Sequence, residues 1–239
     1  MTVTVATQQQ IFAWQLWQDG QRSPAMNMAV DEALLSLCGA DQAPLVRTYG
    51  WDRPSWSIGC FQSWQAAPEC GCFVRRPTGG GVVDHRHDYT YTVVLPGAHP
   101  VCALSAEESY AYINAAVVEA LRALSFDARF TDACIADRVD RRTMVCFSNP
   151  TKYDVVYGGR KVAGAAQRRR RAGILHQGSI ELSALGVVER RSVDRALSAG
   201  LEGVFGAPPG EFDRVDQALA LADSLCAEVY DQESWNYRR

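Results

Sequence analysis

The segment from Arg75 to His85 carries the clearest sign of chemistry in this sequence, and it reads Arg-Arg-Pro-Thr-Gly-Gly-Gly-Val-Val-Asp-His. Three consecutive glycines are poor material for the interior of a strand or helix, because each loses much backbone freedom on ordering. Without Cβ atoms the glycines can lay backbone N–H groups against a ligand, and Arg75 and Arg76 add positive charge beside them. The combination predicts a loop that binds an anionic or carbonyl-bearing ligand.

The same residues are also compatible with a plain glycine-rich turn between two solvated arginines, and this segment leaves both interpretations open. Two common nucleotide-binding patterns are excluded. The segment is not a P-loop, because no Gly-Lys-Ser/Thr sequence follows the glycines. It also lacks the Gly-x-Gly-x-x-Gly spacing of a dinucleotide-binding turn.

A second segment of interest surrounds Lys161, which follows Gly158-Gly159, a signal for a two-residue hairpin turn. The strand predicted after this turn contains small residues at 163–166, which leave room for a ligand to lie against the sheet. A lysine in this setting can neutralise a phosphate, orient a carbonyl or lower the pKa of a neighbouring thiol. The alternative is an edge-strand lysine that discourages aggregation.

The chain contains eight cysteines, and a buried, inert thiol is the default interpretation of each. Residue type alone therefore makes Cys146 one candidate nucleophile among several. Cys70-Gly-Cys72 is the only close-spaced pair, and a single C-x-C is a weak metal signal.

Neither the histidines nor the arginine run indicates a further class of ligand. His85, His87 and His176 fit no metal-binding spacing, so no metal is expected. Four arginines stand together at 168–171. In a chain of net charge −3 they are expected to form a solvated knob, or one that faces an acidic partner, rather than a nucleic-acid site.

Length and composition are those of an ordinary globular protein. With 239 residues, 47% of them hydrophobic and 21% charged, the chain is expected to form one domain over 1–239, without a C-terminal accessory domain. The net charge gives no reason to expect a nucleic-acid or membrane partner. Residues 1–10 do not resemble a signal peptide, and no run reaches the about 18 apolar residues of a membrane span. A cytoplasmic location with reduced thiols is expected.

Alternating patterns and turn signals predict strands in two groups. The first group covers residues 14–18 (as an edge strand), 45–49, 55–61, 72–76 and 89–95. The second covers 153–157, 161–165 and 174–180. Strands that cluster in this way, with helices between and after them, argue for an α+β fold with mixed, mostly antiparallel sheets flanked by helices.

Capping signals mark two of the helices. Ser23 is a predicted N-cap, Pro24 takes the first helical position, and a plausible stop follows at Gly39. Ser105 and Glu108 form a capping box that begins a helix of about twenty residues. Helical character returns from residue 189.

Asp31 and Glu32 are expected on the polar face of the first helix or near the site, with the solvated position favoured. Residues 132–143 are expected to form a polar loop, and residues 234–239 a loose end.

Taken in order, these segments resemble the lipoate–protein ligase and octanoyltransferase superfamily, and the resemblance covers most of the chain. The similar motifs are Asn27-Met-Ala-Val-Asp-Glu-Ala-Leu-Leu35, Arg47-Thr-Tyr-Gly-Trp51 to Ser57-Ile-Gly59 and Gln62, Arg76-Pro-Thr-Gly-Gly-Gly81 to His85, and Gly159-Arg-Lys161-Val-Ala-Gly164 to Gln167. The resemblance implies the catalytic fold shared by class II aminoacyl-tRNA synthetases and biotin–lipoate ligases. The G-R-G-R-x-G loop of biotin ligases is missing.

The resemblance also implies roles for individual residues. Cys146, fifteen residues before Lys161, looks like the nucleophile of the cysteine-dependent transferases, and Lys161 like the lysine of the family's lysine strand. The residues that look like substrate-binding positions are Arg75, Arg76, Thr78, Gly79, Gly80, Gly81, His85 and Gly164. The sequence His176-Gln177-Gly178 departs from the family's His-Gly, so His176 is assigned no role.

The function that follows from the resemblance is N-octanoyl transfer. Cys146 attacks the thioester of octanoyl-acyl carrier protein, and the acyl-enzyme then passes octanoate to a lysine of a lipoyl domain or of the glycine-cleavage H protein. This route needs no cofactor.

Two alternatives stay open. One is an ATP-dependent lipoate–protein ligase, which needs ATP and Mg²⁺ and whose loop often reads Thr-Gly-Gly-Gly as it does here. Transfer of octanoate from one lipoyl domain to another is a variant of the cysteine-dependent transferase route, not of the ligase route. The other alternative is a non-catalytic homologue that binds lipoyl or acyl groups.

Overall fold

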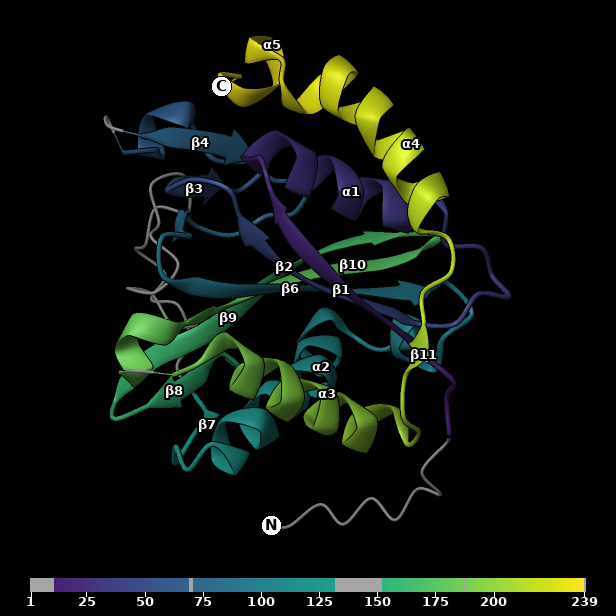
Figure 1. Cartoon of the computed structure of the whole chain (residues 1–239), viewed down its shortest axis with the longest axis vertical. Coiled ribbons are helices and arrows are strands. Elements are labelled where there is room, and N and C mark those ends of the chain that lie inside the picture. The colour runs from purple at the N-terminus through teal and green to yellow at the C-terminus, as the bar shows by residue number, and fades with distance from the viewer. Residues whose placement is uncertain (1–10, 69–70, 132–151, 187, 239) are drawn as a thin grey trace.

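The computed structural model describes residues 11–68, 71–131, 152–186 and 188–238. A large mixed sheet runs through the middle of these residues, in the strand order β11-β1-β2-β6-β10-β9-β8-β7 (Figure 1). Its strands are β1 (Gln15–Arg22), β2 (Leu45–Trp51), β6 (Asp88–Pro96), β7 (Arg129–Phe130), β8 (Val155–Tyr157), β9 (Arg160–Arg170), β10 (Gly173–Glu181) and β11 (Gly210–Glu211). β1 is parallel to both of its neighbours, and the pairings from β2 through to β7 are antiparallel. The predicted mixed, mostly antiparallel arrangement is confirmed.

A small sheet extends this architecture beside α1 (Figure 1). It consists of β4 (Cys72–Arg75), β3 (Ser55–Ile58) and β5 (Val83–Asp84), with β3 parallel to β4 and antiparallel to β5. The glycine segment lies between β4 and β5, and we call residues 76–82 the glycine loop. Since β5 leads directly into β6, the loop is held close to the centre of the large sheet.

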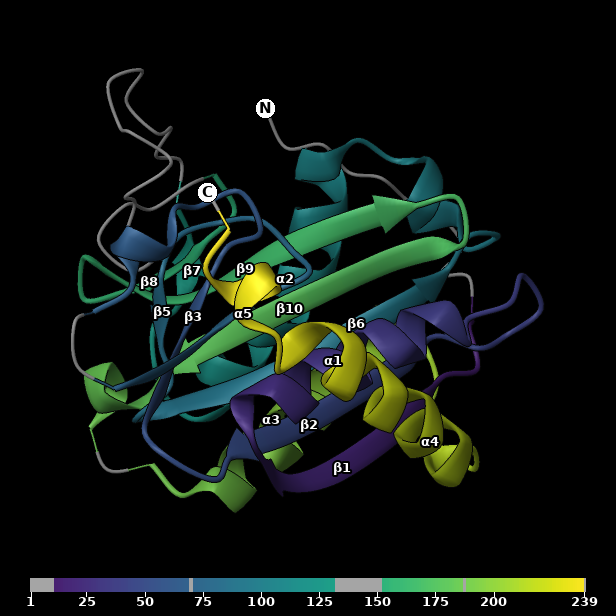
Figure 2. The same ribbon diagram turned by 90° about the horizontal axis from the view of Figure 1, so that it is seen from above.

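Helices cover both faces of the large sheet (Figures 1 and 2). One face carries α1 (Pro24–Ser36), α4 (Val215–Leu225) and α5 (Glu233–Asn236), and the other carries α2 (Ala106–Ala123) and α3 (Arg190–Phe205). Short 3-10 turns occupy Trp64–Ala66, Pro100–Ala103 and Leu182–Leu185, and a π-helical turn occupies Cys226–Tyr230. Two hydrophobic cores result, one on each face of the sheet.

Strand β6 shows how one sequence pattern serves both cores. Successive side chains of a strand point to opposite faces. Tyr91, Val93 and Leu95 accordingly join the core with α2 and α3, whereas Val94 joins the core with α1. Thr92, on the α1 side, is buried and donates a hydrogen bond to Asp31. The alternation predicted from the sequence is confirmed, and its polar face supports the site described below.

The local signals at turns and helix starts are also confirmed. The Ser23 hydroxyl accepts a hydrogen bond from Met26 N, and Ser105 and Glu108 form the expected capping box. Gly158 and Gly159 have φ values of 56° and 78°, as a tight hairpin turn between β8 and β9 requires.

Several expectations about exposure were wrong. Asp31 is fully buried, and Glu32 accepts hydrogen bonds from Arg168 and Tyr230. The expected solvated arginine knob is confirmed in part. Arg169, Arg170 and Arg171 are exposed, whereas Arg168 is half-buried and pairs with Glu32.

The chain ends were also misjudged. Strand β1 is not an edge strand, since β11 pairs with its outer side. Residues 233–236 form helix α5 instead of a loose end. Within the described residues, none of the helices combines the length and the apolar character that crossing a membrane requires.

Candidate active site

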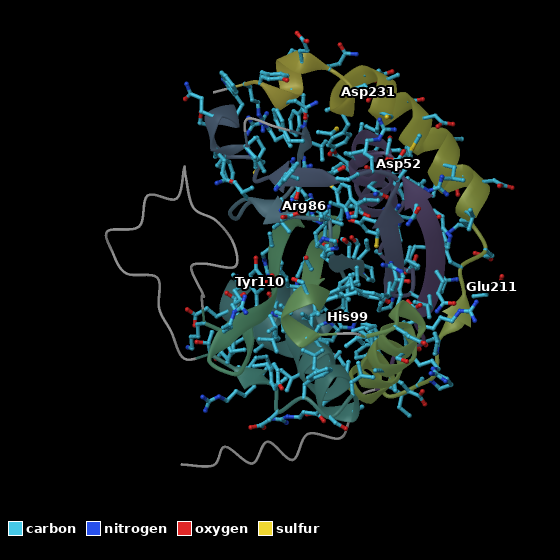
Figure 3. All side chains as sticks on the ribbon, turned by 60° about the vertical axis from the view of Figure 1, so that its left-hand side comes forward. Asp52, Arg86, His99, Tyr110, Glu211 and Asp231 are labelled. Carbon is cyan, nitrogen blue, oxygen red and sulfur yellow. The ribbon has the colours of Figure 1, made fainter. Side chains whose placement is uncertain are left out.

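A pocket lies where the glycine loop, α1 and the small sheet meet strands β2, β6, β9 and β10. Four of the residues predicted to bind substrate line it, namely Arg76, Gly80, His85 and Gly164. Gly164, Ala165 and Ala166 bring β9 into the wall, and their small size leaves the space that the sequence had suggested. Arg86, which follows β5 and lies 5.0 Å from the centre of the Trp56 ring, marks the position of the small sheet in Figure 3.

The glycine loop needs glycine at particular positions because other backbone lies against it. Gly80 has a φ of 88°, in the left-handed region that favours glycine. A Cβ on Gly59 would lie 2.1 Å from Gly80 O, so the two chain segments touch through their backbones. A Cβ on Gly80 would meet Ala166 Cβ at 3.5 Å. The loop therefore lies directly over strand β9.

Arg76 holds the loop in shape from inside. Its Nη1 donates to the carbonyl and hydroxyl oxygens of Ser57, at 2.9 and 2.7 Å. Its Nη2 donates to the carbonyls of Gly79 and Gly81, each at 2.8 Å. The guanidinium is buried and lines the pocket, so it supplies positive charge there while it fixes the loop. Gly79 and Gly81 contribute through these carbonyls rather than as pocket wall.

Arg75 is a correction to the predicted substrate-binding set. Its side chain is fully buried, and its five N–H groups donate to backbone carbonyls of the described chain. These carbonyls belong to Gly59, Gln62, Trp235, Asn236 and Arg238. Burial, followed by the charge of Arg238, lowers the pKa of Arg75 to about 10. Arg75 leaves β4 on the side away from Arg76, and it anchors the C-terminal helix instead of a ligand.

Thr78 acts indirectly. Its hydroxyl is buried and donates to Gln177 Oε1 at 2.6 Å, and Gln177 Nε2 donates to Asp31 Oδ2 at 2.7 Å. Gln177 lines the pocket, whereas Thr78 does not reach it. The chain of hydrogen bonds ties the glycine loop to helix α1 through strand β10.

Asp31 is in turn the centre of a buried ionic network. Arg47 Nη1 donates to Asp31 Oδ1 at 2.7 Å, and both side chains are fully buried. Arg47 also binds Asp19 and Asn27. The Tyr49 hydroxyl donates to Asp31, and burial, followed by the nearby carboxylate, raises the pKa of this tyrosine well above its usual range. Asn27 and Asp31 of the first-helix motif therefore hold α1 against β2 and orient the wall of the pocket.

Lys161 lies beside the pocket, behind Gly164. Its Nζ forms an ion pair with Asp154 Oδ2 at 2.7 Å, and both side chains are almost completely buried. A Cβ on Gly164 would lie 2.4 Å from Lys161 Cε and 2.6 Å from Nζ. The glycine at 164 thus leaves the channel along which the lysine passes, and the edge-strand interpretation of Lys161 was wrong.

Cys146, the predicted nucleophile, lies outside the described residues, as does the loop predicted over 132–143. The residues that flank this segment are placed. Thr131 N donates to Asp154 O at 2.9 Å, and Tyr153 N donates to Thr131 O at 3.2 Å. Both flanks therefore meet beside Asp154, the partner of Lys161.

His85 faces the pocket from the end of β5 and is held on three sides. Its Nε2 lies 2.6 Å from Ser57 Oγ, and its Nδ1 lies 2.7 Å from Asp88 Oδ2. Its ring stacks on Trp51 with centroids 3.9 Å apart.

Sequence reasoning missed several residues of the site, among them Ser57, Asp88, Asp154 and Gln177. A signal for some of them was present. Asp154 directly precedes an apolar strand and Ser57 stands within one, and polar residues at inward positions of a strand need partners when they are buried.

A family model described as the lipoyl protein ligase A/B catalytic domain matches residues 23–197. The octanoyltransferase LipM of Kyrpidia tusciae is 36% identical, over 95% of this chain and 99% of the relative. The octanoyltransferase LipM of Anoxybacillus flavithermus is 41% identical, over 95% of this chain and 98% of the relative.

Solved structures give the same fold. A putative lipoate protein ligase from T. acidophilum with bound lipoic acid has a TM-score of 0.79 at 23% identity, covering 94% of this chain and 99% of that one. A lipoate-protein ligase A bound with ATP also has a TM-score of 0.79, at 22% identity, covering 94% and 98%. These likenesses confirm the predicted fold, and the matched residues of the family model include the whole pocket wall. The chain therefore belongs to the lipoyl protein ligase A/B catalytic domain family.

Proposed function

We propose that this protein is an octanoyltransferase that attaches octanoyl groups to a lysine of lipoyl domains. The observation that carries the proposal is the identity of 36 to 41% with octanoyltransferases named LipM, which extends over 95% of the chain. The pocket supports it, because an acyl carbonyl placed there meets the buried guanidinium of Arg76 and the backbone of Gly80.

In the proposed reaction the Cys146 thiolate attacks the thioester of octanoyl-acyl carrier protein, and the carrier thiolate leaves. The ε-amine of the acceptor lysine then attacks the acyl-enzyme and displaces Cys146 as a thiolate. The route needs no ATP, metal or other cofactor. Acceptors of the same chemistry include lipoyl domains and the glycine-cleavage H protein.

We assign Lys161 to the acyl carbonyl. Its charge is paired with Asp154 at 2.7 Å, and a carboxylate at this distance weakens the field that Lys161 exerts on a thiol. Alkylation of Cys146 by iodoacetamide, followed against pH, tests the assignment. Equal profiles for wild type and Lys161→Ala support it. A rise of one pH unit or more in the midpoint of the variant assigns Lys161 to thiol activation instead.

The transferase route is tested with octanoyl-acyl carrier protein and a lipoyl domain, first without and then with ATP. Modification of the lipoyl domain without ATP is the expected result. Modification that requires free octanoate, ATP and Mg²⁺ would identify a ligase instead, and no modification under either condition would favour a binding homologue.

Cysteine variants locate the acyl group. Cys146→Ala should abolish transfer, and mass spectrometry of wild type should find an octanoyl adduct on Cys146 that hydroxylamine removes. Cys38→Ala and Cys226→Ala are matched controls, because burial raises the pKa of these thiols to about 11 and about 12. If the Cys146→Ala variant transfers octanoate at the wild-type rate, the assignment of Cys146 as the nucleophile is refuted.

A further inference from the structure

Ser57, His85 and Asp88 form a continuous line of hydrogen bonds that ends at the pocket. Ser57 Oγ lies 2.6 Å from His85 Nε2, and His85 Nδ1 lies 2.7 Å from Asp88 Oδ2. Ser57 and His85 line the pocket, and the three side chains come from β3, the end of β5 and β6. The arrangement has the order and spacing of a hydroxyl–imidazole–carboxylate relay.

The direction of each hydrogen bond follows from the groups around the line. Arg76 Nη1 lies 2.7 Å from Ser57 Oγ and can only donate, so the serine oxygen accepts there. The serine proton is then available to His85 Nε2. The His85 Nδ1 proton points to Asp88, which fixes the tautomer. Ser57 Oγ thus sits between a cation and a proton acceptor.

The far end of the line is built to hold a charge. Asp88 Oδ2 also accepts hydrogen bonds from Thr90 Oγ1 at 2.9 Å and from Ser179 Oγ at 2.7 Å. Its side chain is 1% exposed. The stack on Trp51 fixes the plane of the His85 ring, so that both of its nitrogens remain aligned.

We propose that Ser57, His85 and Asp88 relay a proton away from the amine that attacks the bound acyl group. The inference rests on the proposed function and adds the groups that move its proton. When the lysine nitrogen bonds to the acyl carbon, Ser57 Oγ takes an N–H proton and gives its own to His85 Nε2. The carbon–sulfur bond breaks, the thiolate leaves, and the products are the amide and an imidazolium paired with Asp88. Solvent later removes the imidazolium proton.

The second half of the reaction is where such a relay is needed. A thiolate that attacks a thioester carries no proton, whereas an attacking amine becomes a cation that must lose one before the amide forms. The same need arises if the acyl group is presented as an adenylate, so the relay does not depend on how the acyl group is activated. Ser57 is the catalytic member that touches the reacting amine, and Asp88 is a positioning residue.

The test separates the two half-reactions. Octanoyl-acyl carrier protein is mixed with the enzyme, the acyl-enzyme is quantified by mass spectrometry, and a lipoyl domain is then added to follow its discharge. Ser57→Ala, His85→Gln and Asp88→Asn should form acyl-enzyme at close to the wild-type rate. His85→Gln should discharge about 100-fold more slowly, the usual loss when a general base is removed.

Matched controls lie outside the pocket. Ser55→Ala removes a buried serine of the same strand that binds Arg53 O. Asp52→Asn removes a carboxylate that pairs with Arg53 at the surface. His99→Gln replaces a buried histidine near α3 whose Nδ1 accepts from Val101 N. All three should discharge acyl-enzyme at the wild-type rate.

Rescue by imidazole distinguishes proton transfer from a role in packing. The charged groups facing His85 are Asp88, Asp84 and, through Ser57, Arg76. His85→Ala leaves a slot against Trp51, so added imidazole should restore discharge, and only at pH values where imidazole is neutral.

Each outcome decides the proposal. Folded variants that discharge at the wild-type rate refute the relay, and so does equal loss of both half-reactions with a lowered midpoint of unfolding and no rescue by imidazole. Slow discharge with an intact first step and imidazole rescue supports it. A wild-type enzyme that modifies no lipoyl domain refutes the proposed function itself, which is a separate result.

Discussion

The side chain of Lys161 passes directly over Gly164, in a space that any larger residue at 164 would occupy. A Cβ there would lie 2.4 Å from Lys161 Cε and 2.6 Å from its Nζ, well inside van der Waals contact. The same Cβ would lie 3.1 Å from Asp154 Oδ1, so the buried ion pair fits only around a glycine. The geometry explains why the two residues belong to one motif.

Gly164→Ala should therefore act as a mild form of Lys161→Ala. The end of the lysine is flexible, so the variant should fold, but Lys161 must leave Asp154 and its place behind the pocket wall. We expect octanoyl transfer to fall at least tenfold with circular dichroism unchanged. Gly20→Ala is the control, because a Cβ there meets nothing within 4 Å. A Gly164→Ala protein as active as the control would show that the position of Lys161 is unimportant.

Gly79 and Gly80 offer a matched pair within the glycine loop. Gly80 has a φ of 88°, where an L-residue costs about 1 to 2 kcal/mol, so Gly80→Ala should lower the free energy of unfolding by that amount. A Cβ on Gly79 meets only the Phe61 ring, at 3.8 Å and beyond, so Gly79→Ala should be neutral or slightly stabilising. Urea unfolding measures both. Equal effects would mean that the loop relaxes and does not require the left-handed conformation.

Arg75→Lys should destabilise the protein although the charge is kept. Arginine satisfies five backbone carbonyls here, and lysine has three donors, so at least two of these carbonyls lose their partners. At about 1 to 3 kcal/mol for each unsatisfied group, we expect a loss of about 2 to 6 kcal/mol in urea unfolding.

Limited proteolysis should also cut the C-terminal helix of Arg75→Lys faster than that of wild type. Arg53→Lys is the matched control, since the Arg53 side chain is 57% exposed and pairs with Asp52 at the surface. A change within about 0.5 kcal/mol for both variants would contradict the anchoring role of Arg75.

His176 should make the folded state sensitive to acid. Burial lowers its pKa from the ordinary 6.5 to about 3, so the folded protein keeps it neutral while the unfolded chain binds a proton below pH 6.5. The stability that this histidine gives is therefore complete above pH 6.5 and is lost as the pH falls toward 3. The slope is about 1.4 kcal/mol per pH unit, or roughly 2 kcal/mol between pH 6.5 and 5.

Urea unfolding at several pH values measures this slope in wild type and in His176→Gln, which should lose stability less steeply. The exposed His87 provides the control, and His87→Gln should keep the wild-type slope. His99, whose pKa burial lowers to about 4, acts in the same direction, so part of the slope will remain in His176→Gln. An unchanged slope in that variant would show that His176 is protonated in the folded state.

Much of the fold was predictable because its signals are local. Ser23 and Ser105 cap their helices as predicted, since a cap joins residues only three apart. Gly158-Gly159 turns the chain because only glycine accepts both left-handed positions easily. The alternation of β6 separated the two cores for the same reason, because the pleat of a strand has a fixed period.

The tertiary structure decided which of two neighbouring arginines faces the pocket. Arg75 and Arg76 are adjacent in sequence and equal in chemistry, yet one anchors α5 and the other lines the pocket. Successive residues leave an extended chain on opposite sides, and the sequence does not say which side the ligand takes.

The hydrogen bonds of the site join residues that are far apart in the sequence, so they depended on tertiary packing. Ser57 meets His85 across 28 residues, and Thr78 meets Gln177 across 99. From the sequence, Asp31 is expected to be a solvated helix residue. In the structure the buried Arg47 and Gln177 donate hydrogen bonds to it. The sequence by itself determined which elements form and where the glycine loop stands between them. Only the packing of the two sheets against α1 decided which polar groups are buried together, because burial is what forces such groups to find partners.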